Sequence, residues 1–443
     1  MTIQTQNQPG TVFIPAIGDH CEAIAAALRA YGQPSEVLPA TSPTTLATGM
    51  EVGKGRECMF SLMIIGGMLE RAKQPGFDPQ RAALFFPALS RKCVGVNYTS
   101  LFRDALQSNG LEQVEIISPD KANGFRGMGS HPDVVRGLIW HGFIAIDLLL
   151  RIQLQRRPYE LQPGATDLAY QRGLARVIAA IETGENCNVV AALAASASEF
   201  AAVPIDRSVP RPRIGILGDF YMLYNPYLYL DAVNQIESLG GEVEILRFAK
   251  FFYFINWMRE QDAQALKNHQ VAIEVALENA YQHQAEAELV ATVRHLLTDL
   301  NPLEPRASVT VNDIKRYYHV GIVNGGFTAG AAVDMAREGC AGLLHVVPFL
   351  CIGSIIASAL GNRIRADLNQ IPWLDIIFDA QGGTNVRTRL EAFLFQATQF
   401  ERAKISAARE VALPAERTVG AKRAALPRAV APLIPLAVHV SNA

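Results

Sequence analysis

The sequence predicts an α/β protein of two lobes, each with a mainly parallel sheet, and a long helical segment in the first lobe. Three observations lead to this fold class. Short apolar runs alternate with longer helical patterns along both halves of the chain, which is typical of βαβ units. A charged stretch with three prolines, 203–213, separates the halves, and an apolar strand-like run follows it. Segment 131–202 is helical in pattern, with a break at Pro163 and Gly164.

The first lobe is expected to cover residues 1–205. Its strands are predicted where short apolar runs end at glycine, proline or polar residues, and its helices where apolar residues recur on one face. In chain order the expected elements are a strand at 11–16, a helix at 21–31, a strand at 35–38, a helix at 59–72, a strand at 83–87, a helix at 97–108, a strand at 114–117 and the helical segment 131–202.

The second lobe is expected to cover residues 206–406 and to repeat this alternation. Its predicted elements are strand 213–217, helix 227–239, strand 242–246, a helical region over 251–300, helix 327–338, strand 341–347, helix 353–368, strand 374–378 and helix 385–401. From residue 407 to 443 the chain is rich in alanine, proline and arginine without periodicity. We expect this segment to be a flexible or partner-bound tail.

Composition narrows the class of protein. The chain has 443 residues, and its 40 basic and 42 acidic side chains leave a net charge of −2, so no excess charge favours nucleic acid or an anionic membrane. Residues 1–10 lack the features of a secretory signal, and the apolar stretch 138–152 is too short to span a bilayer. We therefore expect a cytoplasmic protein whose partner is a small molecule or another protein.

Three cysteines are the strongest candidates for a functional site. Cys58, Cys93 and Cys351 each follow a strand-like or glycine-rich segment and precede a helical one. Ligands of doubly wound proteins bind outside the carboxyl ends of the strands, so these thiols can converge on one site there. A buried structural cysteine is the alternative for any one of them. As a set they predict either an iron–sulfur cluster with three cysteine ligands or a zinc site completed by water.

Three other residues are candidates for roles in chemistry or substrate binding. His20 follows the strand at 11–16 and is the candidate acid or base, with capping or packing as the alternative. Tyr98 and Asn225 follow strands or loops of the same kind and are candidates for substrate binding, although an aromatic residue in such a place often belongs to the core.

Several sequence blocks, in order over most of residues 11–400, resemble the 2-hydroxyacyl-CoA dehydratase and benzoyl-CoA reductase superfamily, particularly its D-component-like proteins related to acyl-CoA dehydratase activases. The blocks are Phe13-Ile14-Pro15 with Gly18-Asp19-His20, Gly55-Arg56-Glu57-Cys58, Cys93-Val94-Gly95-Val96-Asn97-Tyr98, Ile214-Gly215-Ile216-Leu217-Gly218-Asp219 with Tyr224-Asn225-Pro226, Pro348-Phe349-Leu350-Cys351, and Phe378-Asp379 with Thr388-Arg389-Leu390-Glu391-Ala392-Phe393.

The resemblance implies two flavodoxin-like lobes that hold a [4Fe–4S] cluster through Cys58, Cys93 and Cys351. It also implies that an activase-type ATPase supplies electrons of very low potential under anaerobic conditions. These electrons reduce the thioester of an acyl-CoA to a ketyl radical, which leads to dehydration or reduction of the substrate. The chain has no phosphate-binding loop of the Walker type, so the ATP-dependent step is expected on a separate polypeptide. Relatives act as homo- or heterodimers.

The departures from the family pattern leave the substrate and two alternatives open. Val94 stands where the family has arginine, Asp219 where glutamate is common, and Gly353-Ser354 replaces a turn with proline. One alternative is an electron carrier or binding protein that kept the fold without the chemistry. The other is a double-cubane cluster, which needs six thiolates and would also use the remaining cysteines, Cys21, Cys187 and Cys340.

Overall fold

A computed structural model describes residues 10–87, 94–120, 123–225, 227, 231–298, 317, 324–379 and 385–412. The chain forms two compact units, Met1–Glu401 and Arg402–Ala443. The predicted first lobe and all but the last five residues of the predicted second lobe, 206–406, fall in the first unit. The helix that enters the second unit, α14 (Val386–Ala412), continues past the predicted start of the tail at residue 407, and residues 413–443 lie outside the described residues.

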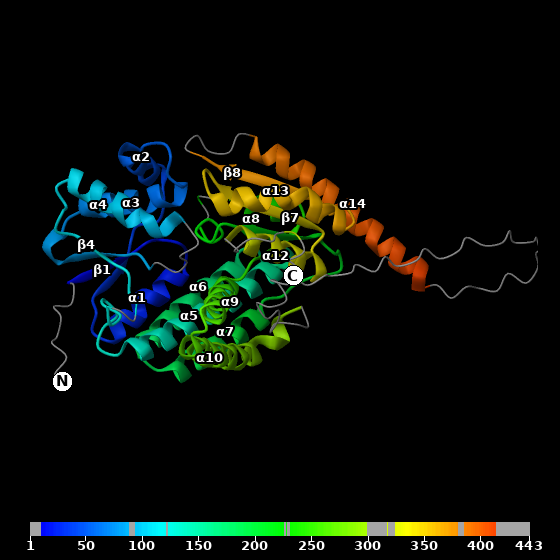
Figure 1. Ribbon diagram of the computed structural model, residues 1–443. Coiled ribbons are helices and arrows are strands. Elements are labelled where there is room, and N and C mark those ends of the chain that lie inside the picture. Colours follow the sequence, from blue (N-terminus) through cyan, green and yellow to red (C-terminus); the bar gives the residue numbers. More distant parts are fainter. Residues whose placement is uncertain are drawn as a thin grey trace, which may run out of the picture. The chain divides into compact units, whose positions relative to one another are not determined.

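The first sheet is parallel, and its strands lie in the order β2-β1-β3-β4 (Figure 1). Phe13 in the central strand pairs with Glu36 on one side and with Leu84 on the other. The chain adds β2 on one side of β1 and then β3 and β4 on the other side, a change of direction that is typical of doubly wound folds. The strands are β1 (Thr11–Ile14), β2 (Ser35–Val37), β3 (Ala82–Phe85) and β4 (Glu115–Ile117), and the helices of this lobe are α1 (His20–Ala30), α2 (Pro43–Val52), α3 (Met59–Ala72) and α4 (Tyr98–Ser108).

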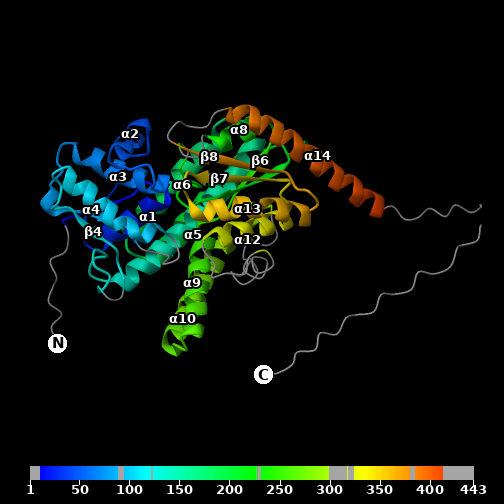
Figure 2. The ribbon, with the colours of Figure 1, turned by 45° about the horizontal axis from the view of Figure 1, so that its top comes forward.

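The second sheet repeats the same order as β6-β5-β7-β8 and is also parallel. Figure 2 shows helices α12 and α13 on one face of this sheet and α8 and α14 on the other. The strands are β5 (Arg213–Gly218), β6 (Glu242–Ile245), β7 (Gly342–Pro348) and β8 (Trp373–Phe378), and the helices are α8 (Ala232–Ser238), α12 (Asn324–Arg337) and α13 (Ile352–Asp367).

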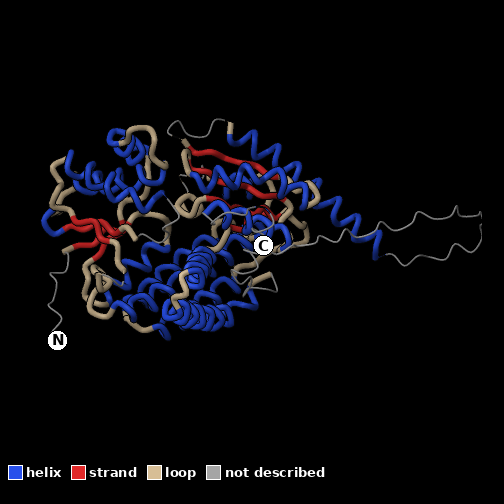
Figure 3. Tube along the Cα trace, in the orientation of Figure 1, coloured by secondary structure: helices blue, strands red, loops and turns tan. Residues whose placement is uncertain are grey.

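A group of long helices accompanies the two sheets, whose strands form separate groups in Figure 3. The predicted segment 131–202 folds as α5 (Pro132–Arg156), α6 (Ala165–Glu182) and α7 (Asn186–Ala202). Two helices from the second half, α9 (Phe248–Ala265) and α10 (His269–Val293), pack against α5 as well. None of the described helices combines the length and apolar character that crossing a membrane requires.

The predicted fold class is confirmed: the described residues form an α/β structure with two all-parallel, four-stranded sheets. Most expected elements appear within a few residues of their predicted bounds. One helix, α2, was missed. It begins with Pro43 in its first turn, and its N-cap Ser42 forms a capping box with Thr45, so a local signal for this helix was present in the sequence.

Close backbone contacts join the two lobes near the carboxyl ends of their central strands. Gly18 lies against Tyr224 so closely that a Cβ atom there would be 2.6 Å from the Tyr224 Cβ, and its φ of 151° also favours glycine. The Asn225 amide donates hydrogen bonds across the same contact to Thr41 Oγ1 at 2.8 Å and Ala16 O at 3.3 Å. These contacts hold the carboxyl edge of one sheet next to the carboxyl edge of the other.

Candidate functional site

A cavity of about 300 Å³ is lined by loops and helix starts from both lobes. Residues from the first lobe in its wall include Cys58 and Tyr98, and residues from the second include Asp219 and Cys351. Asp219 follows β5 and Cys351 follows β7, the two central strands at which the order of the second sheet reverses. Doubly wound proteins bind ligands at this point of a sheet.

Two of the predicted cysteine ligands meet at this cavity. Cys58 is the N-cap of α3 and Cys351 is the N-cap of α13, so each sulfur lies at the start of a helix. The loops are joined by a backbone hydrogen bond of 3.2 Å, which the Met59 N–H donates to Phe349 O. As a result, thiols from different lobes come within hydrogen-bonding distance of each other.

The environment of Cys351 favours its thiolate. The Cys58 thiol donates a hydrogen bond to the Cys351 sulfur, which lowers the pKa of Cys351. Burial opposes this effect, but the backbone N–H groups of Ser354 and Gly353 and the Ser354 hydroxyl donate further hydrogen bonds. Together these contacts lower the pKa of Cys351 to about 6. The same hydrogen bond to Cys351, together with burial, raises the pKa of Cys58. The pair therefore holds one negative charge at neutral pH, and the thiolate is the form of cysteine that binds metals.

Asp219 completes the polar part of the site. Its Oδ2 atom lies 3.8 Å from the sulfur of Cys351. Burial, and then the negative charge of Cys351, raise the pKa of the Asp219 carboxyl to about 8, although its other oxygen accepts the Tyr221 N–H at 3.0 Å. Near neutral pH this carboxyl is mostly protonated, so the site avoids two adjacent negative charges.

The rest of the wall is largely apolar, although it includes Arg56, Arg247 and Thr328, and the cavity lies at the amino ends of several helices. Its aromatic wall is made by Phe60, Phe220, Phe251 and Phe327. The first turns of α3, α9, α12 and α13 all contribute to its lining. Because the N-terminus of a helix carries a partial positive charge, this arrangement stabilises negative charge inside the cavity.

The third predicted ligand, Cys93, lies outside the described residues. Gly95, two positions further along the chain, is part of the cavity wall. Within the residues that the structure describes, no group of three or more His, Cys, Asp or Glu side chains is arranged to hold a metal ion. The described part of the site thus supplies two of the three predicted thiols.

The remaining cysteines lie away from this cavity. Cys21 is buried in α1, where burial raises its pKa to about 12, and Cys340 precedes the amino end of β7, the end of the strand opposite to Cys351. Cys187 is exposed on α7. None of the three is in the cavity wall as described, and these positions do not favour a cluster that uses all six thiols.

The other predicted site residues separate into two groups. Tyr98 lies in the cavity wall, where its hydroxyl accepts the Cys58 N–H at 2.8 Å. Asn225 is buried in the contact between the lobes, and His20 lines a second cavity on the other side of Tyr224. The structure therefore places Tyr98 beside the cysteines. The described lining of their cavity does not include His20 or Asn225.

Several polar residues of the cavity wall were not predicted as site residues, and Asp219 and Arg247 are among them. Asp219 and Arg247 both lie in the wall, and both follow the carboxyl end of a strand, β5 and β6 respectively. The rule that singled out the cysteines applies equally to them. Arg247 is half-buried and forms an ion pair of 2.5 Å with Glu286 of α10, so its charge is balanced.

Fold and site together define a two-lobed α/β protein with a cavity between its lobes that contains two thiols and a largely aromatic wall. No protein-family model matches the chain, and the search of curated proteins also gave no match. The description of the protein as a two-lobed α/β protein with this cavity therefore rests on its fold and site geometry alone.

Proposed function

We propose that the protein binds an iron–sulfur cluster through Cys58, Cys93 and Cys351 and acts as the catalytic component of an ATP-dependent radical dehydratase or reductase. In this proposal a separate activase-type ATPase delivers low-potential electrons, and the substrate is a small molecule such as an acyl-CoA. The observation that carries the proposal is the meeting of Cys58 and Cys351, from different lobes, at the rim of a 300 Å³ cavity.

The residues present fit a [4Fe–4S] cluster in three respects. Of the two described thiols, Cys58 is buried and Cys351 is half-buried, and the pair shares one negative charge, which provides the thiolate that binds a metal. The helix N-termini around them stabilise the negative charge of a thiolate-bound cluster. The aromatic wall limits access of water, which is one of the factors that set the potential of such a cluster.

A bound cluster would supply one-electron chemistry and an iron without a cysteine ligand, at which a substrate oxygen can bind. The chain itself contributes the surroundings of that position. Tyr98 holds the Cys58 loop through the Cys58 N–H, and the backbone at Gly353 and Ser354 orients Cys351. The Phe60 and Phe327 rings bound the space next to the thiols, so a substrate there is shielded from solvent.

The open space next to the thiols favours a catalyst over the alternative of an electron carrier. A carrier needs only a cluster close to the surface, whereas this cavity extends beyond the cysteines to α9 and α12. Zinc held by three cysteines and water would also use this thiol set, so metal analysis has to separate the two cofactors.

Metal analysis of cysteine variants tests the ligand set. The protein is purified without oxygen, and iron, acid-labile sulfide and zinc are measured in wild type and in Cys58→Ala, Cys93→Ala and Cys351→Ala. The matched controls are Cys21→Ala, Cys187→Ala and Cys340→Ala. We expect iron and sulfide to fall strongly in each of the first three and to stay at the wild-type level in the controls. Full iron content in all of the first three variants would rule out the ligand set.

A second experiment separates catalyst from carrier. The reconstituted protein is mixed with an activase-type ATPase, ATP and a reductant, and the electronic spectrum is followed with and without candidate thioesters. We expect ATP-dependent reduction of the cluster, followed by reoxidation when a substrate is present. Reduction that no thioester ever reverses would favour the electron carrier.

A further inference from the structure

A group of exposed apolar side chains surrounds the loop that carries Cys351. Each of its members is between 37 and 53 % exposed, although side chains of this kind are usually buried. Single apolar residues on a surface are common, whereas a contiguous group marks a site of interaction. We call the group the apolar patch, and its members are Phe349, Leu350, Ile352, Ile355 and Ile377.

Contacts between helix α13 and strand β8 show that the apolar patch is contiguous. The Ser358 hydroxyl of α13 hydrogen-bonds to Asp375 of β8. Three residues later on the helix, Gly361 packs against the β8 residue that lies two positions earlier on the strand. The same step taken in the opposite direction along both elements places Ile355 beside Ile377.

The loop of the apolar patch also contains a strained residue. Leu350 has a φ of 63°, in the left-handed region that favours glycine, and its side chain is partly exposed. Neither its backbone nor burial in the core explains a leucine at this position, and strain of this kind is concentrated at functional sites. The loop is held beside β8, because the Phe349 N–H donates to Phe378 O at 2.9 Å. Its exposed side chains thus form one defined surface with those of α13 and β8.

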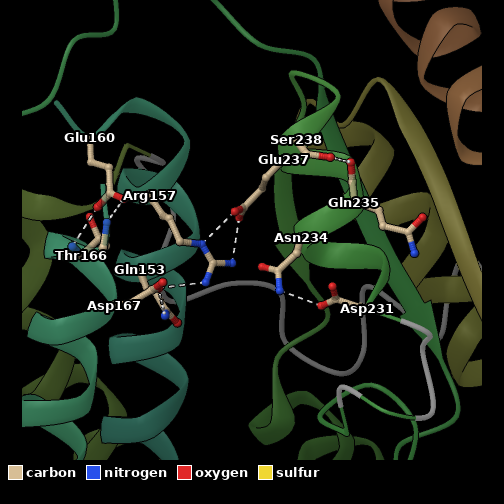
Figure 4. Close-up of polar contacts among 11 residues, drawn as sticks. Gln153, Arg157, Glu160, Thr166, Asp167, Asp231, Asn234, Gln235, Glu237 and Ser238 are labelled. Carbon is tan, nitrogen blue, oxygen red and sulfur yellow. Dashed lines mark hydrogen bonds and ion pairs between the residues drawn. The ribbon is translucent and has the colours of Figure 1, made fainter. Parts of the chain in front are cut away.

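Two arginines beside the apolar patch have no carboxylate partner among the described residues. Arg56 lies in the wall of the 300 Å³ cavity together with two members of the patch, and Arg389 donates to the backbone of β8 two residues before Ile377. Arg157, by contrast, is neutralised: Figure 4 shows its guanidinium between two carboxylates, which lie at 2.7 and 2.9 Å. The two unpaired arginines therefore give the surroundings of the patch a positive charge.

The carboxylates near the apolar patch are less exposed than these arginines. Glu57 is half-buried, and it accepts the backbone N–H groups of Lys54 and Arg56 at 3.0 and 2.9 Å. Asp379, which follows β8, is also half-buried. Lys54 adds a further exposed positive charge. The exposed rim of the patch, formed by Lys54, Arg56 and Arg389, is therefore basic, and it matches a surface that carries carboxylates.

We infer that the apolar patch is the docking site of the protein that donates electrons, and that this donor presents an apolar centre surrounded by carboxylates. The inference rests on the proposed function, in which Cys351 is a ligand of the cluster. One electron leaves the reduced donor and enters the cluster, and no bond forms or breaks. Electron transfer between proteins requires the two centres to approach closely, and the patch surrounds the loop that ends at Cys351, the N-cap of α13.

Two other occupants match the apolar patch less well. A second copy of the chain in a two-fold contact would bring two basic rims together, because such a contact uses the same surface on both sides. An anionic membrane would match the rim, but the chain as a whole has 40 basic and 42 acidic side chains and therefore no general attraction to such a surface.

Titration calorimetry without oxygen measures the binding of an activase-type ATPase to wild type and to two variants of one residue. Ile355 is exposed and is not among the residues that line the cavity as described. Ile355→Glu and Ile355→Lys both remove the apolar side chain, but they carry opposite charges. We expect Ile355→Glu to bind about tenfold more weakly than wild type, and Ile355→Lys to bind about threefold more tightly than Ile355→Glu. Ile273→Glu, at an exposed position of α10, is the control and should bind as wild type does.

Several results would overturn the inference. Equal affinity of wild type and Ile355→Glu, or no binding of the ATPase to wild type, would show that the donor docks elsewhere. If Ile355→Lys binds no more tightly than Ile355→Glu, the docking face of the donor is not acidic. Binding to phosphatidylserine vesicles, or a dimer in sedimentation, that is lost in Ile355→Glu would assign the patch to a membrane or to a second copy of the chain.

A second measurement separates this inference from the proposed function on which it rests. In Ile355→Glu we expect slower ATP-dependent reduction of the cluster, with the iron content and the reduction by titanium(III) citrate unchanged. Wild type that lacks iron would contradict the proposed function. Wild type that contains the cluster, but binds the ATPase no better than Ile355→Glu does, would contradict the docking site alone.

Discussion

The residue before Cys351 adopts a backbone conformation that its side chain disfavours. Leu350 has a φ of 63°, in the left-handed region, where an L-residue with a side chain is less stable than glycine. The strained residue places the Cys351 sulfur at the start of α13, next to the Cys58 loop.

This strain can be measured with a pair of variants. Leu350→Gly and Leu350→Ala both remove the partly exposed side chain, but only glycine removes the strain. We expect Leu350→Gly to be more stable than Leu350→Ala by about 1 kcal/mol in the free energy of unfolding, measured with urea. Equal stability of the two variants would show that Leu350 is not strained.

Asp375 gives the stability of the second sheet a dependence on pH. Burial tends to raise the pKa of this carboxyl, but hydrogen bonds from His345 Nδ1 and Trp373 Nε1, both at 2.8 Å, outweigh burial and hold the pKa below its ordinary value. Because the folded pKa is lower than the unfolded one, this stabilisation is complete above the unfolded value of about 3.9 and is lost as pH falls below it.

Urea unfolding at a series of pH values tests this effect in wild type and Asp375→Asn. We expect the difference in stability between the two proteins to be constant from neutral pH down to about pH 5 and to shrink as the pH falls below about 4. Asp133→Asn, exposed on α5, serves as the control. A difference that stays constant down to pH 3, or grows there, would contradict the lowered pKa.

Part of the site could be predicted from single residues and part could not. Cys58, Cys351 and Tyr98 were found because each lies at the start of a helical pattern, after a strand-like or glycine-rich segment, and they share one cavity. Asn225 was predicted by the same reasoning, but its amide donates hydrogen bonds to Thr41 and Ala16 of the other lobe. Sequence position indicates the edge of the sheet on which a residue lies, but the partner of a side chain depends on how the lobes pack.

At the scale of elements, the prediction succeeded where an apolar run or a helical pattern was clear, and it failed where the evidence was confined to a helix cap. The strands of both sheets were predicted because each is a short apolar run between turns, and α5 because its helical pattern is long. Helix α2 has ten residues and a weak pattern, and its evidence lies in its cap alone. The packing of α9 and α10 on α5 depends on contacts distant in sequence, which no local pattern reveals.

The cap of α2 predicts a measurable loss of stability. The Ser42 hydroxyl accepts the Thr45 N–H at 3.2 Å, and Thr45 Oγ1 accepts the Ser42 N–H at 3.2 Å. We expect Ser42→Ala to lower the free energy of unfolding by about 1 kcal/mol, measured with urea. Thr44→Ala, on the exposed side of the same first turn, is the control and should change stability much less. Equal effects of the two substitutions would argue against the capping box.

At the scale of the whole first unit, the site exists only because the two lobes meet. Cys58 and Cys351 belong to different lobes, and the contacts of Gly18 with Tyr224 and of Asn225 with Thr41 lie at the same edge. Alone, the first lobe would present the start of α3 with Cys58, and the second lobe would present the starts of α9, α12 and α13 with Cys351. Together they enclose the cavity in which the thiols share a charge.

Removing the Asn225 amide tests this dependence. Asn225→Ala leaves Thr41 Oγ1 and Ala16 O without their donor, and we expect the free energy of unfolding to fall by about 1–3 kcal/mol. Iron content after anaerobic purification should fall as well if the lobes separate. Asn188→Ala, whose amide bonds only within the helical segment, is the control. A stable protein with full iron content would show that the contact is dispensable.

The most direct test of the central claim is the metal content of the wild-type protein purified without oxygen. A cluster held by Cys58, Cys93 and Cys351 predicts about four iron atoms and about four sulfide ions per chain, lost together on exposure to air. About one zinc ion per chain without sulfide, or no metal at all in protein that is folded, would contradict the claim.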